Sequence, residues 1–508
     1  MTRRKTFLIA VLLAAAGLRL YSLGSKSLWL DEIVSVQHVR GSFGQMLSEV
    51  AQHDGHPPLY YIFQYAAKIF GRSELAVRLP SAAFGIALLY VVYRLGRSLL
   101  DETAGLAAAG LTAISGFAIF YSQEARPYAL AMLLAAASAW VLAELLRRGG
   151  LGDAASQSPA LTRGGGQLED STRPYKIRPT GWWIAYTLTG AAMLYTFYYL
   201  AFALLAEAVA VLALRRRDRE FMVRWLISRA IVAAAFAPYL IVVLNRIAGL
   251  PAAAGQSRWE VLASLPGGYV QMLTGIDPAM LHGSAPVAAF VYAAGIIPIV
   301  AGLALLWRTK PSTRAFALLA ASVAVPAAAL LLLPWRLQIF EAKHLAFAAP
   351  ALLIIAAWLP VRIRRPVAWL PVGLIFLLNV YSLAVYHSPE FQKERWPEAC
   401  RIVHENVHPG DAIYFNPFYL SYGFIYYYEY HGELIRIENP SQLQNGIRPK
   451  RLWLIEDRGS NIAPADPAVE TIVRQRFQPA AFRHDGEDTH EAVLPGYMGS
   501  VAIQLFAP

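Results

Sequence analysis

Four short clusters of ionisable residues lie beside apolar stretches of this chain. They are Asp31 and Glu32 in LWLDEIVS, His53, Asp54 and His56 in HDGHPPLYY, Gln123, Glu124 and Arg126 in YSQEARPYAL, and Arg336, Glu341, Lys343 and His344 in RLQIFEAKHL. Ionisable groups at membrane depth are costly to place, so they are candidates for function.

Acids on two loops and bases on another suit the transfer of a sugar from a lipid phosphate to a hydroxyl. A positioned carboxylate can act as the general base that deprotonates the hydroxyl. The leaving phosphate needs cations, and arginine offers two parallel N–H donors for it. The sequence therefore predicts Asp31 as the base and Arg126 and Lys343 as phosphate ligands.

Each cluster also has a purely structural interpretation, and these alternatives stay open here. Acids such as Asp31 often cap helix N-termini, and an acid near Arg126 can form a weak surface ion pair. Surface histidines are usually solvated, although His53 and His56 have a spacing that could bind a metal. Lys343 can anchor a helix at the lipid head groups.

The composition indicates a membrane protein. Of 508 residues, 56% are hydrophobic and only 16% are charged, which is too apolar for an ordinary soluble protein. The net charge of +11 does not indicate nucleic-acid binding, because Lys and Arg gather at the ends of apolar runs. The single Cys400 excludes an intramolecular disulfide and a cysteine-based metal site.

Eleven apolar runs have about the length needed to span a bilayer. They lie near residues 7–23, 79–97, 104–120, 127–146, 182–196, 198–214, 225–246, 286–306, 315–334, 344–360 and 367–387. The first run follows a basic start, and Arg19 and Tyr21 stand where signal cleavage would need small residues. We therefore expect an uncleaved first helix in an α-helical polytopic membrane protein.

Basic residues orient these spans. The six loops on the side of the N-terminus hold 22 Lys and Arg residues, against about ten on the other side before residue 387, and basic loops stay cytoplasmic. Counting PPLYYIFQYAAKIFG as a span would invert every later loop, and it is too short to cross. Residues 24–78 are therefore predicted as an outside loop with an interfacial helix starting at Pro57 and Pro58, and residues 147–180 as a cytoplasmic loop.

The chain divides near residue 387 into a transmembrane catalytic domain, 1–387, and a small extracytoplasmic α/β domain, 388–508. In the second part, KERWPEACRIVHENV is typical of a helix, and DAIYF and RPKRLWLIED are typical of strands. YYYEY at 426–430 favours a half-buried strand over an acceptor site, and YTFYYLAF at 195–202 an interfacial aromatic belt.

Four motifs carry a resemblance to a known family: DE after the first helix, HPPLYY, GRSELAVRLPSAAFG and YSQEARPYAL. Over about the first 145 residues the chain resembles the GT-C membrane glycosyltransferases, specifically the protein O-mannosyltransferase and aminoarabinose-transferase-like superfamily, glycosyltransferase family 39. The resemblance implies polyprenyl-phosphate sugar donors used on the outer membrane face. It also implies catalytic roles for Asp31 and Glu124, and positions near the lipid phosphate for His56 and Arg126.

The remaining site residues lie in the four clusters of ionisable residues and in HPPLYY. The predicted substrate-binding residues are Glu32, His56, Tyr60, Gln123, Arg126, Lys343 and His344. His56 and Glu124 are also candidate ligands of a divalent metal. The family commonly has an Arg-Tyr pair where this chain has Lys343 and His344, and here the second acid is glutamate, which leaves metal dependence open.

The sequence thus predicts an inverting hexosyl or pentosyl transferase of a bacterial-type inner membrane, acting on a lipid, glycan or protein and not on nucleic acid. Two alternatives stay open: a secondary transporter and a non-enzymatic envelope assembly protein. Transporters place charges at the bilayer midplane and often show repeats, whereas this chain places its charges at one face.

Overall fold

The protein is described from a computed structural model. It describes residues 3–148, 179–248, 256–277, 284–309, 313–333, 340–428, 434–439, 442, 449–458, 466–497 and 500–508. Most of the predicted cytoplasmic loop 147–180 and Arg336 lie outside the described residues. The chain forms two compact units, one of Met1–Tyr21, Leu47–Phe63 and Pro80–Ala384, and one of Ser22–Met46, Gln64–Leu79 and Val385–Pro508.

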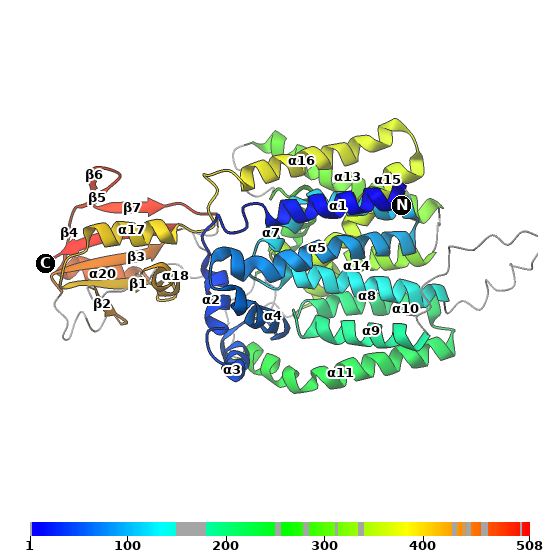
Figure 1. The fold of residues 1–508 in the computed structure, drawn as a ribbon, viewed down its shortest axis with the longest axis horizontal. Helices are drawn as coiled ribbons and strands as arrows, with labels where there is room; N and C mark the ends of the chain where they lie inside the picture. The colour runs from blue at the N-terminus through cyan, green and yellow to red at the C-terminus, as the bar shows by residue number, and fades with distance from the viewer. Residues whose placement is uncertain are drawn as a thin grey trace, which may run out of the picture. The chain divides into compact units, whose positions relative to one another are not determined.

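The first unit is a bundle of helices that run side by side (Figure 1). Its long helices are α1 (Arg3–Leu20), α5 (Glu74–Leu99), α6 (Glu102–Ile114), α7 (Gly116–Ser122), α8 (Tyr128–Arg148), α9 (Pro179–Leu194), α10 (Leu200–Arg215), α11 (Arg219–Ala248), α12 (Arg258–Thr274), α13 (Ala285–Thr309), α14 (Thr313–Leu332), α15 (Ala349–Ile363) with the preceding 3-10 helix η4 (Ala342–Ala348), and α16 (Leu370–Tyr386) after η5 (Pro366–Trp369).

Every predicted span coincides with a helix, but not every helix is long and apolar enough to cross a membrane alone. Among the described residues seven helices meet that test, and the pair α6 and α7, bent by 61°, would be an eighth. Helices α9 and α10 have only 16 residues each, and α1 carries four basic residues. The α-helical membrane fold class is confirmed, while the number of eleven spans stays a prediction.

The break between α6 and α7 sets the position of the next turn. Ser115 caps α7 by accepting a hydrogen bond from the Ala118 N–H at 3.2 Å, and the Asn379 side chain of α16 accepts one from the Gly116 N–H at 2.7 Å. Because these polar contacts fix α7, they also fix the turn that joins it to α8, where residues 123–127 lie.

The predicted outside loop contains three short helices: α2 (Leu30–His38), α3 (Phe43–His53) and α4 (Leu59–Ala67), with η1 (Lys68–Phe70) after α4. The predicted helix after Pro57 and Pro58 is therefore present, and its nine residues are too few to span a bilayer. Neither α2, α3 nor α12 was predicted. Helix α12 starts at a capping box formed by Ser257 and Glu260, a signal that its sequence does contain.

The second unit contains a small α/β fold, as predicted. Its helices and strands are α17 (Trp396–Asn406), β1 (Asp411–Asn416), α18 (Leu420–Tyr427), β2 (Leu434–Ile437), β3 (Arg451–Asp457), α20 (Pro467–Arg476), β4 (Gln478–Pro479), β5 (Phe482–His484), β6 (Glu487–Thr489), β7 (Glu491–Leu494) and β8 (Val501–Ala507).

The main sheet has the strand order β2-β1-β3-β8-β4, with β7 also beside β8. Strand β1 is parallel to β2 and β3, whereas β8 is antiparallel to β3, β4 and β7. Alternate residues of β1 face opposite sides: Ala412 and Tyr414 share a core with Val473 of α20, and Phe415 contacts Phe424 of α18. Helices thus cover both faces of the sheet.

The strand predicted at 426–430 is wrong where the structure describes it, because Tyr426 and Tyr427 end helix α18. Their hydroxyl groups form hydrogen bonds with residues of the predicted outside loop 24–78. Tyr426 donates to the Arg72 carbonyl at 2.8 Å, and Tyr427 donates to the Glu74 carboxylate at 3.0 Å. These two hydrogen bonds connect α18 to residues far away in the sequence. Such contacts cannot be read from the strand propensity of the tyrosines.

Replacing Gly423 by alanine is expected to destabilise the protein by about 1–3 kcal/mol, the usual cost of overpacking a core. A Cβ at Gly423 would lie 2.5 Å from Nε1 of Trp396, a fully buried residue. Thermal unfolding of the purified chain measures the effect. Gly44→Ala in α3 is the control, because nothing lies within 4 Å of its Cβ position; equal melting temperatures of both variants would contradict this packing.

Candidate active site

Arg126 is the centre of a buried polar cluster in the first unit. Its guanidinium lies 2.9 Å from Nδ1 of His56 and 3.3 Å from Oδ2 of Asp54. It also donates to the Tyr61 hydroxyl at 3.1 Å. Asp54, His56 and Arg126 are 3%, 8% and 6% exposed. Three partners therefore hold the orientation of one buried arginine.

The stretch HDGHPP forms this cluster through its own local chemistry. Helix α3 ends at His53, and the Asp54 carboxylate then accepts a hydrogen bond from the His56 backbone N–H at 2.7 Å. This bond from a side chain to the backbone two residues on makes a turn. Oδ1 of Asp54 also lies 2.9 Å from the His56 Nδ1, so that nitrogen either donates to Asp54 or accepts from Arg126, according to its protonation.

A row of rings links His56 to the fourth cluster of the sequence. His56 stacks on Phe197, with ring centroids 5.4 Å apart, and Phe197 lies 6.4 Å from the ring of His344. His344 stacks on Tyr199 at 4.9 Å. The structure therefore brings His56, Arg126 and His344 into one neighbourhood, and Phe197 belongs to it rather than only to the predicted aromatic belt.

Lys343 lies next to this row and pairs with an acid. Its Nζ is 2.8 Å from Oε2 of Glu341, and the lysine side chain is 15% exposed. Glu341 therefore partly balances the charge of Lys343, as Asp54 partly balances that of Arg126.

Tyr60 and Gln123 have contacts that explain them structurally. Tyr60 bonds to Ser81 at 2.9 Å and is fully buried. The Gln123 amide donates to the carbonyls of Arg19 and Tyr21 at 3.0 and 2.8 Å, where α1 ends and carbonyls lack helical partners. Both residues therefore support the turn that carries Arg126, and their predicted substrate contacts stay predictions.

Glu124 is fully buried in the same turn, two residues before Arg126. Its predicted role as a second acid is compatible with this place. For the predicted metal, the described residues hold no group of three or more His, Cys, Asp or Glu side chains that could bind one. The guanidinium beside His56 also makes that histidine a poor cation ligand. The two predicted metal ligands therefore stay predictions, and no step of the proposed reaction is assigned to a metal.

Asp31 and Glu32, in the second unit, have different environments although they are neighbours in sequence. Asp31 is the second residue of α2 and is partly buried. Glu32 is fully buried and forms two hydrogen bonds with the Arg78 guanidinium, at 2.8 and 2.7 Å, and lies 3.3 Å from Nζ of Lys393. The contacts of Glu32 indicate a structural ion cluster.

A second carboxyl group supports the start of α2. Glu394 accepts a hydrogen bond from the Leu30 N–H at 3.0 Å and another from the Trp396 ring. Burial is the main reason why the pKa of Glu394 is raised to about 8, and the negative charge of Asp31 contributes. Glu394 is therefore mostly protonated at neutral pH, which avoids a second negative charge beside Asp31.

Several residues of these clusters were not identified from the sequence. Tyr61 and Phe197 are aromatic residues within aromatic and apolar runs, so nothing in the sequence distinguishes them from their neighbours. Arg78 lies inside GRSELAVRLPSAAFG, a motif that indicated only the family resemblance. Arg246, in α11, donates to the carbonyls of Val50 and Ala51 at 2.7 and 2.9 Å and so fixes the end of α3. An arginine within an apolar helix was the available signal for Arg78 and Arg246.

Comparison with known proteins supports the resemblance. Residues 55–154 match the family model described as dolichyl-phosphate-mannose-protein mannosyltransferase, and this range includes His56, Glu124 and Arg126. No curated protein matches the chain in sequence.

Solved structures share the fold. The oligosaccharyltransferase of Archaeoglobus fulgidus, solved with a tethered acceptor peptide, is 12% identical, with a TM-score of 0.51 over 89% of this chain and 69% of that one. The same archaeal enzyme, AglB, solved with an inhibitory peptide and a dolichol-phosphate, is 13% identical at the same TM-score and the same coverage of both chains. ArnT from Cupriavidus metallidurans covers 99% of this chain and 98% of its own at 13% identity, but its TM-score of 0.44 supports no argument.

The predicted fold class is confirmed by these neighbours. The mannosyltransferase match covers a segment of the chain, and the structural likeness covers most of it. Together they show a fold shared with the archaeal oligosaccharyltransferase and a segment that is similar to the mannosyltransferase family.

Proposed function

We propose that this chain transfers a sugar from a polyprenyl-phosphate donor to a lipid, glycan or protein acceptor on the outer face of a bacterial-type inner membrane, with a cytoplasmic N-terminus. The observation that carries this proposal is the buried cluster of Arg126, His56 and Asp54. His56 and Arg126 lie within the segment that matches the mannosyltransferase family, and Asp54 is the residue just before it. The dolichol-phosphate bound to the archaeal neighbour supports a lipid phosphate as the donor group.

Arg126 suits the phosphate role because its orientation is set before any ligand binds. Asp54, His56 and Tyr61 each contact one of its terminal nitrogens. A guanidinium held in this way can stabilise charge that develops on a leaving phosphate without reorganising. In this proposal Lys343 and His344 add to the phosphate environment.

The proposed step is an inverting displacement. The acceptor oxygen forms a bond to the anomeric carbon on the face opposite the phosphate, and the bond from that carbon to the phosphate oxygen breaks. The electron pair of that bond leaves with the lipid phosphate, whose charge Arg126 stabilises. Asp31 takes the proton of the acceptor hydroxyl as general base. Glu124 keeps its predicted role as a second acid near the acceptor.

Replacing Arg126 by lysine is expected to lower kcat/KM for the lipid-phosphate donor about 10- to 100-fold. Lysine keeps the charge but loses the fork that makes parallel bonds, and a charge-assisted hydrogen bond contributes about 1.5–3 kcal/mol. Transfer kinetics with the purified chain measure the effect.

Arg147→Lys is the matched control, because Arg147 lies at the opposite end of α8, 53% exposed, where it pairs with Glu144. The control should keep the activity of the unchanged protein. If Arg126→Lys also kept full activity, Arg126 would not bind the phosphate.

A further inference from the structure

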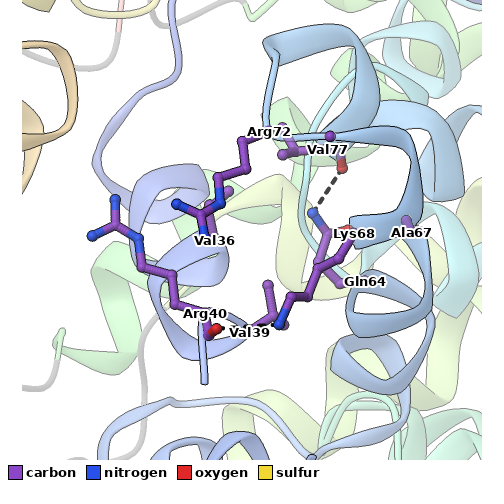
Figure 2. Close-up of a pocket in the computed structure, with 9 residues that line it drawn as sticks. Val36, Val39, Arg40, Gln64, Ala67, Lys68, Arg72 and Val77 are labelled. Carbon is purple, nitrogen blue, oxygen red and sulfur yellow. Dashed lines mark hydrogen bonds between the residues drawn. The ribbon is translucent and has the colours of Figure 1, made fainter. Parts of the chain in front are cut away.

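A small pocket with a basic rim lies in the second unit, and none of the residues given a catalytic or substrate-binding role above lines it. It is open to solvent, holds about 310 Å³ of empty space with the open solvent included, and is lined by Val36, Val39, Arg40, Lys68, Arg72 and Val77, among others. Figure 2 shows the side chains of Arg40, Lys68 and Arg72 around it. These three come from the residues after α2, from η1 and from the turn after η1.

Local contacts hold this rim in place. Nζ of Lys68 donates to the carbonyls of Arg40 and Gly41 at 3.1 and 3.0 Å. The chain turns at Gly71, whose φ of 100° suits glycine, and the Tyr426 hydroxyl bonds to the Arg72 carbonyl at 2.8 Å. The backbones of the three basic residues are therefore fixed, so the positive charges stay together.

The pocket combines positive charge with an apolar floor. Valine and alanine side chains form the floor, and no carboxylate is among the described residues that line it. Arg40 also lies over the Tyr426 ring, 5.8 Å from its centroid. Such a site suits an anion that is attached to apolar matter.

Two large apolar side chains are exposed beside the basic rim. Ile69 and Phe70, the residues between Lys68 and Gly71, are 83% and 63% exposed. Exposed apolar residues next to cations are typical of a surface that enters the interface of an anionic membrane. Because the chain is a membrane protein, the occupant that fits both features is a lipid rather than a free anion.

We propose that this pocket binds the phosphodiester head group of an anionic glycerophospholipid, with Arg40, Lys68 and Arg72 contacting the phosphate and Ile69 and Phe70 entering the acyl region. This binding does not depend on the proposed transferase activity. Lipid binding here would attach η1, and with it the predicted outside loop 24–78, to the membrane surface.

The test counts phospholipids that stay bound to the full-length chain. The purified protein is placed in nanodiscs of phosphatidylcholine with phosphatidylglycerol, and retained lipids are measured by native mass spectrometry. Arg40→Gln with Arg72→Gln should weaken phosphatidylglycerol binding at this site about thirtyfold and so lower its retention, because a basic side chain near an anionic surface contributes about 1 kcal/mol and 1.4 kcal/mol is a factor of ten. Phosphatidylcholine retention should not change.

The matched control removes two exposed charges elsewhere in the same unit, Arg401→Gln with Arg474→Gln, each about half exposed at 49%. Its phosphatidylglycerol retention should equal that of the unchanged chain. Equal retention by the rim variant would overturn the proposal. Displacement of phosphatidylglycerol by equimolar polyprenyl phosphate or by inorganic phosphate would overturn it too, since the pocket would then be a donor site or a general anion site.

Discussion

Replacing Asp31 by asparagine is expected to lower the rate of sugar transfer about 10²- to 10⁴-fold, the usual contribution of a general base. Asparagine keeps the size of the side chain at the second position of α2 but cannot accept the proton of the acceptor hydroxyl. The loss should appear in kcat, because the carboxylate acts in the transition state of the reaction and is not a contact that binds the substrate. Single-turnover transfer with the purified chain measures it.

The matched control for Asp31→Asn is Asp488→Asn, the same chemical change at an exposed position of β6. Asp488→Asn should keep full activity, and the melting temperatures of both variants should equal that of the unchanged chain. An Asp31→Asn variant that transfers sugar at the normal rate would remove Asp31 from the mechanism. An unfolded variant would not show whether Asp31 acts as a general base or only supports the structure. Asp31→Glu, which keeps a carboxylate, is therefore measured in parallel and should keep part of the activity.

Glu32→Gln, one residue further on, is expected to destabilise the protein by about 3–5 kcal/mol, the cost of breaking a buried ion pair by removing one partner. Glu32, Arg78 and Lys393 are 0%, 2% and 0% exposed. Without the Glu32 carboxylate, the buried cations Arg78 and Lys393 would lose the negative charge that they both contact. The measurement is thermal unfolding of the purified chain, together with the yield of folded protein.

A second substitution tests whether the charges are the cause. Adding Lys393→Met to Glu32→Gln removes one of the two uncompensated cations, so the double variant should recover part of the lost stability. If Glu32→Gln instead left the melting temperature unchanged and raised only KM for the donor, Glu32 would bind substrate, as the sequence predicts, and its ion pairs would be of little structural importance.

Hydropathy was sufficient to predict most of the helices, because a long apolar run has few alternatives to a helix in a bilayer. The two strands DAIYF and RPKRLWLIED were predicted for a similar reason, since both are short apolar runs bounded by turn residues, and they became β1 and β3. Local caps would have added α12, which starts at Ser257.

Contacts between distant segments could not be predicted in the same way. Nothing near Glu32 in the sequence indicates that Arg78 and Lys393 surround it, and nothing near His56 indicates Phe197. The tyrosines at 426 and 427 have strand propensity, but their bonds to Arg72 and Glu74 are made from a helix. Sequence reasoning identified Asp54, His56 and Arg126, on two separate turns, as candidates because charges beside apolar segments are rare.

The most direct test of the proposed function is to follow a radiolabelled sugar from a polyprenyl phosphate into the lipid, glycan and protein fractions of membranes that contain this chain. We expect label to enter one of the three fractions, and to stay on the donor in membranes that contain Asp31→Asn at the same level. Label that never leaves the donor, or that leaves it equally well in both membranes, would contradict a transferase with Asp31 as its base and favour a transporter or an assembly protein.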